Sequence, residues 1–149
     1  MIRAILIFCI LALVLPLSQA WASDSPQEVR HEIMEAVGDA AKPVGMMLKG
    51  EQEFDPAVVM ESFQVWSDAA AKFGNHFPEG SETGYDTEAK ETIWTDRAGF
   101  DEHLVGFGDA AYAALEARPQ NLEDLKAAAG PVFKTCKSCH EDYRVEDED

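Results

Sequence analysis

Apolar residues recur at intervals of three and four along nearly all of the chain from residue 25 onward, and this periodicity most constrains the fold. A helix turns once every 3.6 residues, so side chains with this spacing line up on one face. Sustained alternation of apolar and polar residues, which is typical of strands, is nearly absent, and there is no Asn-Gly hairpin turn. The pattern predicts an all-α fold in which each helix buries one apolar face.

Residues that start and stop helices separate four such stripes. Ser25-Pro26-Gln27-Glu28 has the form of a capping box with proline at the first helical position. Asp55-Pro56 and Asn121 mark two further starts, and Gly50 marks an end. We therefore expect helices from Pro26 to just before Gly50, from Pro56 to about Phe73, from a start between Lys90 and Asp96 to Arg118-Pro119, and from Leu122 onward.

Four amphipathic helices joined mostly by short links predict an antiparallel up-down four-helix bundle. The exception is the connection over residues 74–89, which is a long loop. Pro43 in the first helix and Gly130-Pro131 in the last are expected to bend their helices. Bundles of this kind bind cofactors between facing helices, so a cofactor site is expected in the interior.

The first residues have the features of a signal peptide. Arg3 provides a positive start, an apolar run follows over residues 4–17, and residues 18–22 end in the small-x-small pattern of a cleavage site. The run is shorter than the roughly 20 apolar residues that a membrane span needs. We expect residues 1–22 to be removed, leaving a domain over residues 23–149 that is periplasmic and has no membrane anchor.

The composition is strongly acidic. The 149 residues include 12 Lys and Arg against 28 Asp and Glu, for a net charge of −16. Removal of the signal peptide would take away Arg3 and no acid, leaving 11 basic against 28 acidic residues and a net charge of −17. Such a surface repels phosphates, which argues against nucleic acid as a partner and favours a basic redox partner protein. Solubility alone is the simpler reason for the charge, and we favour it over a specific partner.

Cys136-Lys137-Ser138-Cys139-His140 has the C-x-x-C-H spacing of covalent haem attachment. Two thioether bonds must reach two vinyl groups at one edge of a rigid porphyrin, while an imidazole approaches the iron from one face. At about 100° per residue, the three side chains fall on one face of a helix. The motif predicts one covalently bound haem c per chain, attached through Cys136 and Cys139, with His140 as the axial iron ligand.

Two other uses of the motif are less well supported. A C-x-x-C redox pair would be expected near a βαβ pattern, which this helical chain lacks. A zinc site would need a second Cys/His pair, and His31, His76 and His103 are not grouped to supply one. We interpret His76 and His103 as ordinary loop and helix-surface histidines.

The sequence resembles the cytochromes c′, the class II c-type cytochromes, over essentially the whole chain after the signal peptide. The similar segments are Arg30-His31-x-x-Met34, Phe77-Pro78-Glu79-Gly80-Ser81, Ile93-Trp94 and Cys136-Lys137-Ser138-Cys139-His140-Glu141-Asp142-Tyr143-Arg144. The resemblance implies a homodimeric four-helix bundle with covalent haem, His140 as axial ligand and usually no sixth ligand.

The resemblance also implies haem contacts for five further residues. Met34 would pack over the distal face, Arg30 would lie near the propionates, and Arg144 would be a proximal arginine. His31, where the family commonly has glutamine, would also contact the haem, and Glu88 lies in the loop region that often touches the haem edge. For Arg30, the helical pattern supports the same contact independently of the resemblance. A guanidinium on an apolar stripe needs an anionic partner, which a propionate would provide.

Three functions remain open. In the first, which we favour, the iron is five-coordinate and high-spin, and the protein binds NO or CO or transfers electrons. In the second, the Met34 sulfur is the sixth ligand of a low-spin electron carrier like the cytochromes c-556, since Met/His ligation suits electron transfer. The third is a peroxidase-like enzyme, which needs a distal acid or base, and His31 could serve only if it turned inward.

Overall fold

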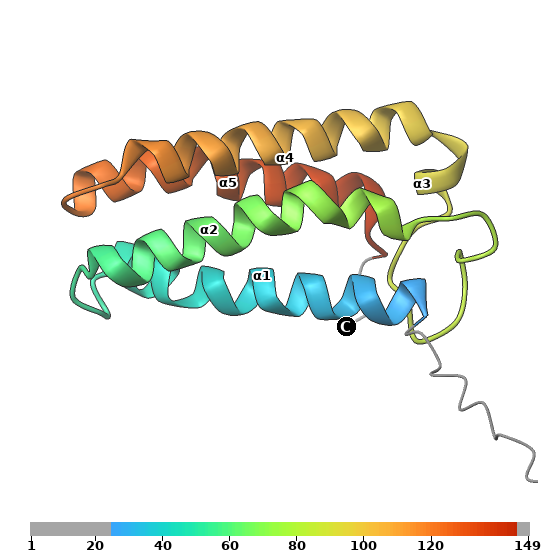
Figure 1. Cartoon of the computed structure of the whole chain (residues 1–149), viewed down its shortest axis with the longest axis horizontal. Helices are drawn as coiled ribbons and strands as arrows, with labels where there is room; N and C mark the ends of the chain where they lie inside the picture. The colour runs from blue at the N-terminus through green and yellow to red at the C-terminus, as the bar shows by residue number, and fades with distance from the viewer. Residues whose placement is uncertain (1–24, 146–149) are drawn as a thin grey trace, which may run out of the picture.

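The computed structural model describes residues 25–145, and it confirms the predicted four-helix bundle. The long helices are α1 (Pro26–Lys49), α2 (Pro56–Phe73), α4 (Arg97–Ala117) and α5 (Leu122–Tyr143). A 3₁₀ turn, η1 (Gly74–His76), and a one-turn helix, α3 (Thr92–Thr95), lie in the connection from α2 to α4. The long helices lie side by side, each running opposite to the one before it (Figure 1).

Each long helix begins at a side chain that accepts hydrogen bonds from backbone amides of the first turn. This residue is Ser25 for α1, Asp55 for α2, Asp96 for α4 and Asn121 for α5. An oxygen in this position satisfies amides that have no partner inside the helix. At its other end α1 stops at Gly50, whose φ of 75° is left-handed and suits a residue without a side chain.

The third predicted helix is divided in the structure. The sequence predicts a single helix that starts between Lys90 and Asp96, whereas α3 ends at Thr95 and a new helix begins at Arg97. Asp96 has φ −122° and ψ 56°, which interrupts the helical backbone, and its carboxylate then caps α4. α1 and α5 each contain an interior proline, Pro43 and Pro131, and both helices continue past it.

Apolar side chains from all four long helices fill the core. The largest fully buried ones include Trp66, Phe63, Phe100, Met47 and Leu125. Burying a large apolar side chain stabilises a fold by about 1.5–3 kcal/mol. The buried indole is also satisfied, because Trp66 Nε1 donates to Val37 O at 3.2 Å and so joins α2 to α1.

The bundle has one open seam, between α1 and α5. α1 packs along α2, α2 along α4 and α4 along α5, but α1 and α5 contact each other over much less of their length. The loop over residues 77–90 lies at the end of the bundle where α1 begins and α5 ends (Figure 1).

The sequence predicts a cleaved signal peptide and no membrane anchor in the remaining chain. Within residues 25–145, no helix combines the length and the apolar character needed to cross a bilayer. The predicted signal peptide, residues 1–22, lies outside the described residues.

Candidate haem site

Two adjoining cavities lie along the seam between α1 and α5. The larger has a volume of about 560 Å³ and the smaller about 150 Å³. Both are lined by His31 and Met34 from α1 and by Cys139 and His140 from α5. Pockets for organic ligands measure roughly 300–1,000 Å³, so the larger cavity has the size of a cofactor site.

Large apolar side chains from three helices form much of the wall of the larger cavity. They are Trp66, Phe73, Leu104, Phe107 and Phe133. The rings of Trp66 and Phe133 pack edge to face, with centroids 5.6 Å apart and planes at 71°. A wall of this kind fits the flat, apolar faces of a porphyrin.

Cys136, Cys139 and His140 line the larger cavity together from one face of α5, as their spacing predicts. The two cysteines do not form a disulfide. Burial raises the pKa of both thiols, and for Cys139 the nearby Cys136 and Asp142 add to the effect and bring the pKa to about 11. A redox-active C-x-x-C pair has a lowered pKa. This pair is therefore poorly suited to thiol–disulfide exchange and fits covalent attachment.

The imidazole of His140 is in a state suited to binding iron. Burial lowers its pKa, Arg144 lowers it further, and Glu88 opposes the shift. A lowered pKa favours the neutral ring, which is the form that offers a nitrogen lone pair to a metal. The donor set of two thiols and one neutral imidazole on an apolar wall matches a covalently bound haem.

Met34 lines both cavities from α1, and it packs against the main core. Within residues 25–145, no other methionine lines either cavity. Met47 is fully buried among the helices, and Met46 is 39% exposed. The methionine that the sequence singles out is thus the one that shares cavity walls with His140.

Arg30 is buried, with 5% of its surface exposed, and it also lines the smaller cavity. Its Nη1 donates to His76 O and Ser81 Oγ, both at 3.0 Å. Its Nη2 donates to Ser81 O at 2.9 Å and to Thr87 Oγ1 at 3.2 Å. These acceptors are neutral, so the anionic partner that we expected a buried guanidinium to need is replaced here by loop oxygens. Contact between Arg30 and a propionate stays a prediction.

Glu88 and Arg144 form an ion pair on the wall shared by the two cavities. Backbone hydrogen bonds flank the pair: Val145 N donates to Glu88 O at 2.7 Å, and Lys90 N donates to Tyr143 O at 2.9 Å. The paired side chains are 52% and 41% exposed, so the ion pair adds at most about 1 kcal/mol of stability. The main effect of the ion pair is to hold the long loop against the end of α5.

His31 lines both cavities but is an exposed residue, so its ring lies at the cavity mouth. It packs edge to face with Tyr85, with ring centroids 6.1 Å apart. All the haem-contact residues predicted from the sequence therefore line at least one cavity. Tyr85 was not predicted, and as a loop residue outside any apolar stripe it gives no signal that could have identified it.

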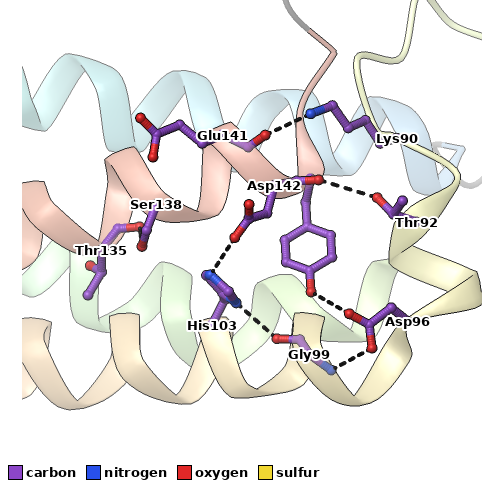
Figure 2. A network of polar contacts seen from close by, with 10 residues as sticks. Lys90, Thr92, Asp96, Gly99, His103, Thr135, Ser138, Glu141 and Asp142 are labelled. Carbon is purple, nitrogen blue, oxygen red and sulfur yellow. Dashed lines mark hydrogen bonds and ion pairs between the residues drawn. The ribbon is translucent and has the colours of Figure 1, made fainter.

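His103 is not the ordinary surface histidine that the sequence suggests. Its Nδ1 lies 3.0 Å from Gly99 O and its Nε2 lies 3.2 Å from Asp142 Oδ2 (Figure 2). The side chain is 27% exposed, and it lines the larger cavity. A signal was available, because His103 follows Phe100 by three residues and precedes Phe107 by four, and both belong to the inward stripe.

Comparisons with known sequences agree with this site. The family profile described as Cytochrome C′ matches residues 25–144. A cytochrome c′ of Rhodopseudomonas palustris is 42% identical over 116 residues, which is 78% of this chain and 79% of the relative. A cytochrome c-556 of the same organism is 29% identical over 139 residues, covering 89% of this chain and 91% of the relative.

Solved structures show the same likeness. The structure of cytochrome c′ from Rhodopseudomonas palustris superposes with a TM-score of 0.80 at 39% identity, over 85% of this chain and 100% of that one. A cytochrome c′ described as having an unusual ligand-controlled dimer dissociation has a TM-score of 0.75 at 26% identity, over 84% and 100% of the two chains.

A nitric oxide complex of a mutant cytochrome c′ from Alcaligenes xylosoxidans is also similar, with a TM-score of 0.65 at 28% identity over 82% and 98% of the two chains. The profile match spans nearly all of the described residues, including both α1 and the C-x-x-C-H motif of α5. The chain therefore belongs to the cytochrome c′ family, and it carries covalently bound haem c.

Proposed function

We propose that the chain is an exported haem c protein whose iron is five-coordinate and high-spin, and that it binds small diatomic gases such as NO and CO or transfers electrons. When bound, haem supplies an iron that can change oxidation state and accept a diatomic ligand. Cys136 and Cys139 would hold the porphyrin by one edge, and the neutral imidazole of His140 would ligate the metal.

The observation that carries this proposal is the apolar wall of α1 on the cavity that His140 lines. Met34, Val37 and Ala41 give this wall its apolar surface, and the exposed His31 and Glu35 of α1 line the same cavity. Water and anions lose much of their hydration on entering an apolar space, whereas a neutral diatomic loses little. A wall of this kind supports selective access of uncharged gases to an otherwise open iron position.

A low-spin His/Met electron carrier is the second candidate. Met34 is the methionine on the cavity walls, and a cytochrome c-556 is among the relatives. A Met sulfur as axial ligand raises the reduction potential and would occupy the position that a gas needs. The two candidates therefore differ in one bond, between Met34 Sδ and iron.

The absorption spectrum of the ferric protein separates the two candidates. We expect a high-spin spectrum without the charge-transfer band of methionine–iron bonding, and the presence of that band would refute the five-coordinate assignment. Met34→Ala should accelerate CO association with the ferrous protein by roughly tenfold, or about 1.4 kcal/mol off the barrier, because it removes the side chain that would crowd the iron. Met34→Leu keeps the volume without the sulfur and should resemble the wild type.

We propose no enzymatic role for the chain. A peroxidase needs a positioned distal acid or base, and His31, the histidine of α1, lies at the cavity mouth as an exposed residue. The purified protein should turn over hydrogen peroxide no faster than its His31→Gln variant. A large loss of turnover in that variant would assign catalysis to His31.

We further propose that the protein is a periplasmic homodimer with a basic redox partner. The support is the predicted signal peptide, the acidic composition and a similar cytochrome c′ described as having a ligand-controlled dimer dissociation. Sequencing the amino terminus of the exported protein should identify Ser23 or a neighbouring residue. Light scattering with and without CO would measure both the assembly and its response to ligand.

A further inference from the structure

The loop over residues 77–90, called the strap below, contacts both helices that border the open seam, α1 and α5. We propose that Arg30 and Thr87 are positioning residues that hold the strap across this seam. By fixing α1 relative to α5, the strap sets how closely Met34 crowds the iron. The second part rests on the proposed function, whereas the first part concerns the protein fold alone.

One guanidinium anchors the strap to α1. Arg30 donates to Ser81 and to Thr87, which lie six residues apart on the strap. The same group lies over the rings of Phe77 at 4.6 Å and Trp94 at 5.6 Å. Because a guanidinium is planar and its donors have fixed directions, it holds several points of a loop in one geometry.

The far end of the strap is anchored to α5. Glu88 pairs with Arg144, and an isolated antiparallel bridge joins Ala89 to Arg144. Lys90 Nζ donates to Glu141 O at 2.7 Å, a contact visible in Figure 2. Thr87 and Glu88 are adjacent, so the anchor on α1 and the anchor on α5 are separated by a single peptide bond.

The backbone before these anchors adopts an unfavourable conformation. Tyr85 and Asp86 have φ angles of 49° and 46°, in the left-handed region that side chains disfavour. Both residues line the smaller cavity, and Tyr85 packs against His31. Conformations of this kind persist only where surrounding contacts hold them, and Thr87, immediately after Asp86, is where the guanidinium binds.

The anchor lies one helical turn from Met34, since Arg30 precedes it by four residues on α1. α1 and α5 have few direct contacts that could fix their separation. The strap is therefore placed to determine the position of this turn of α1 relative to His140 on α5. Loosening it should let the Met34 side chain withdraw more often from the iron.

Replacement of Thr87 tests the proposal without altering either arginine. Thr87→Val keeps the shape and removes the hydroxyl that accepts from Arg30 at 3.2 Å and from Ala89 N at 3.4 Å, whereas Thr87→Ser keeps the hydroxyl. Asp55→Ala is the matched control, because it removes the cap of α2 and so costs stability away from the strap. The first measurement is amide hydrogen exchange at Lys90 and Val145, whose amides bond across the junction of the strap and α5. The second is CO association with the ferrous holoprotein.

We expect Thr87→Val to accelerate exchange at these two amides and CO association each by at least about fivefold, the factor that corresponds to loss of the hydrogen bond from Arg30 alone. Thr87→Ser and Asp55→Ala should leave both rates near those of the wild type. If the exchange rates are unchanged in Thr87→Val, or change equally in Asp55→Ala, the proposal that Arg30 and Thr87 hold the strap is refuted. If amide exchange is faster but CO association is unchanged, the strap does not set how closely Met34 crowds the iron. A methionine–iron band in the wild-type spectrum would instead refute the proposed five-coordinate function. The exchange rates would still show whether Arg30 and Thr87 hold the strap.

Discussion

The hydroxyl of Tyr143 donates a hydrogen bond to Asp96 Oδ2 at 3.1 Å, and the other oxygen of this carboxylate accepts from Gly99 N at 3.3 Å. Tyr143 is the last residue of α5, three positions after His140, and Asp96 is the cap of α4. One carboxylate thus joins the haem-binding end of α5 to the start of α4. Figure 2 shows Asp96 and Gly99 in this network beside His103 and Asp142.

The network leaves no room for a side chain at Gly99. An added Cβ would lie 2.4 Å from Asp96 Oδ2 and 2.6 Å from the Tyr143 hydroxyl. We expect Gly99→Ala to lower the free energy of unfolding by about 2 kcal/mol, because it displaces a helix cap and breaks a partly buried hydrogen bond. Chemical denaturation of the haem-loaded protein measures this change.

Gly106 provides the control in the same helix. Nothing lies within 4 Å of a Cβ added there, so Gly106→Ala should gain the helix propensity of alanine and raise the free energy of unfolding by up to about 1 kcal/mol. If the two variants shift stability in the same direction and by the same amount, the network around Asp96 is not the cause.

Tyr143 should make stability depend on pH in the alkaline range. Its burial raises the phenol pKa, and the hydrogen bond and charge of Asp96 raise it further. The native state then holds the proton more tightly than the unfolded state. This stabilisation is complete below the unfolded pKa of about 10 and is lost as the pH rises through the folded value. Unfolding titrations above pH 10 should therefore fall less steeply in Tyr143→Phe, and parallel curves would contradict this account.

The two thiols should each attach one edge position of the haem. Cys136→Ser and Cys139→Ser should each retain covalent haem with one unsaturated vinyl group, which shifts the pyridine haemochrome absorption maximum to longer wavelength. The double variant should release its haem on denaturation in acidified solvent. Cys9→Ser, in the predicted signal peptide, should leave the spectrum unchanged. Covalent haem in the double variant would refute the attachment sites.

Charge should govern encounters with redox partners. With a predicted net charge of −17 after export, reduced protein should react faster with cationic than with neutral small oxidants of equal potential at low salt. Raising the ionic strength to about 0.1 M shortens the screening length to about 10 Å and should reduce that advantage. Stopped-flow rates against salt concentration test this, and a rate that rises with salt for a cationic oxidant would argue against it.

Local patterns were sufficient to predict the helices and the attachment face. The caps Ser25, Asp55 and Asn121 act on amides two or three residues away, and the Cys136-to-His140 spacing defines a common face on any helix. Such interactions occur within one helical turn, so the order of the residues determines them directly. The four stripes then allowed only a bundle.

Tertiary structure alone decided the partners of the polar side chains around the cavities. The acceptors of Arg30 lie 46 to 57 residues away in sequence, and His103 reaches Asp142 on another helix. These contacts depend on the path of a loop with no repeating pattern and on the relative positions of packed helices. Helical hydrogen bonds are local, whereas contacts across a bundle exist only once the chain has folded, so periodicity could identify a buried arginine but not the atoms that it meets.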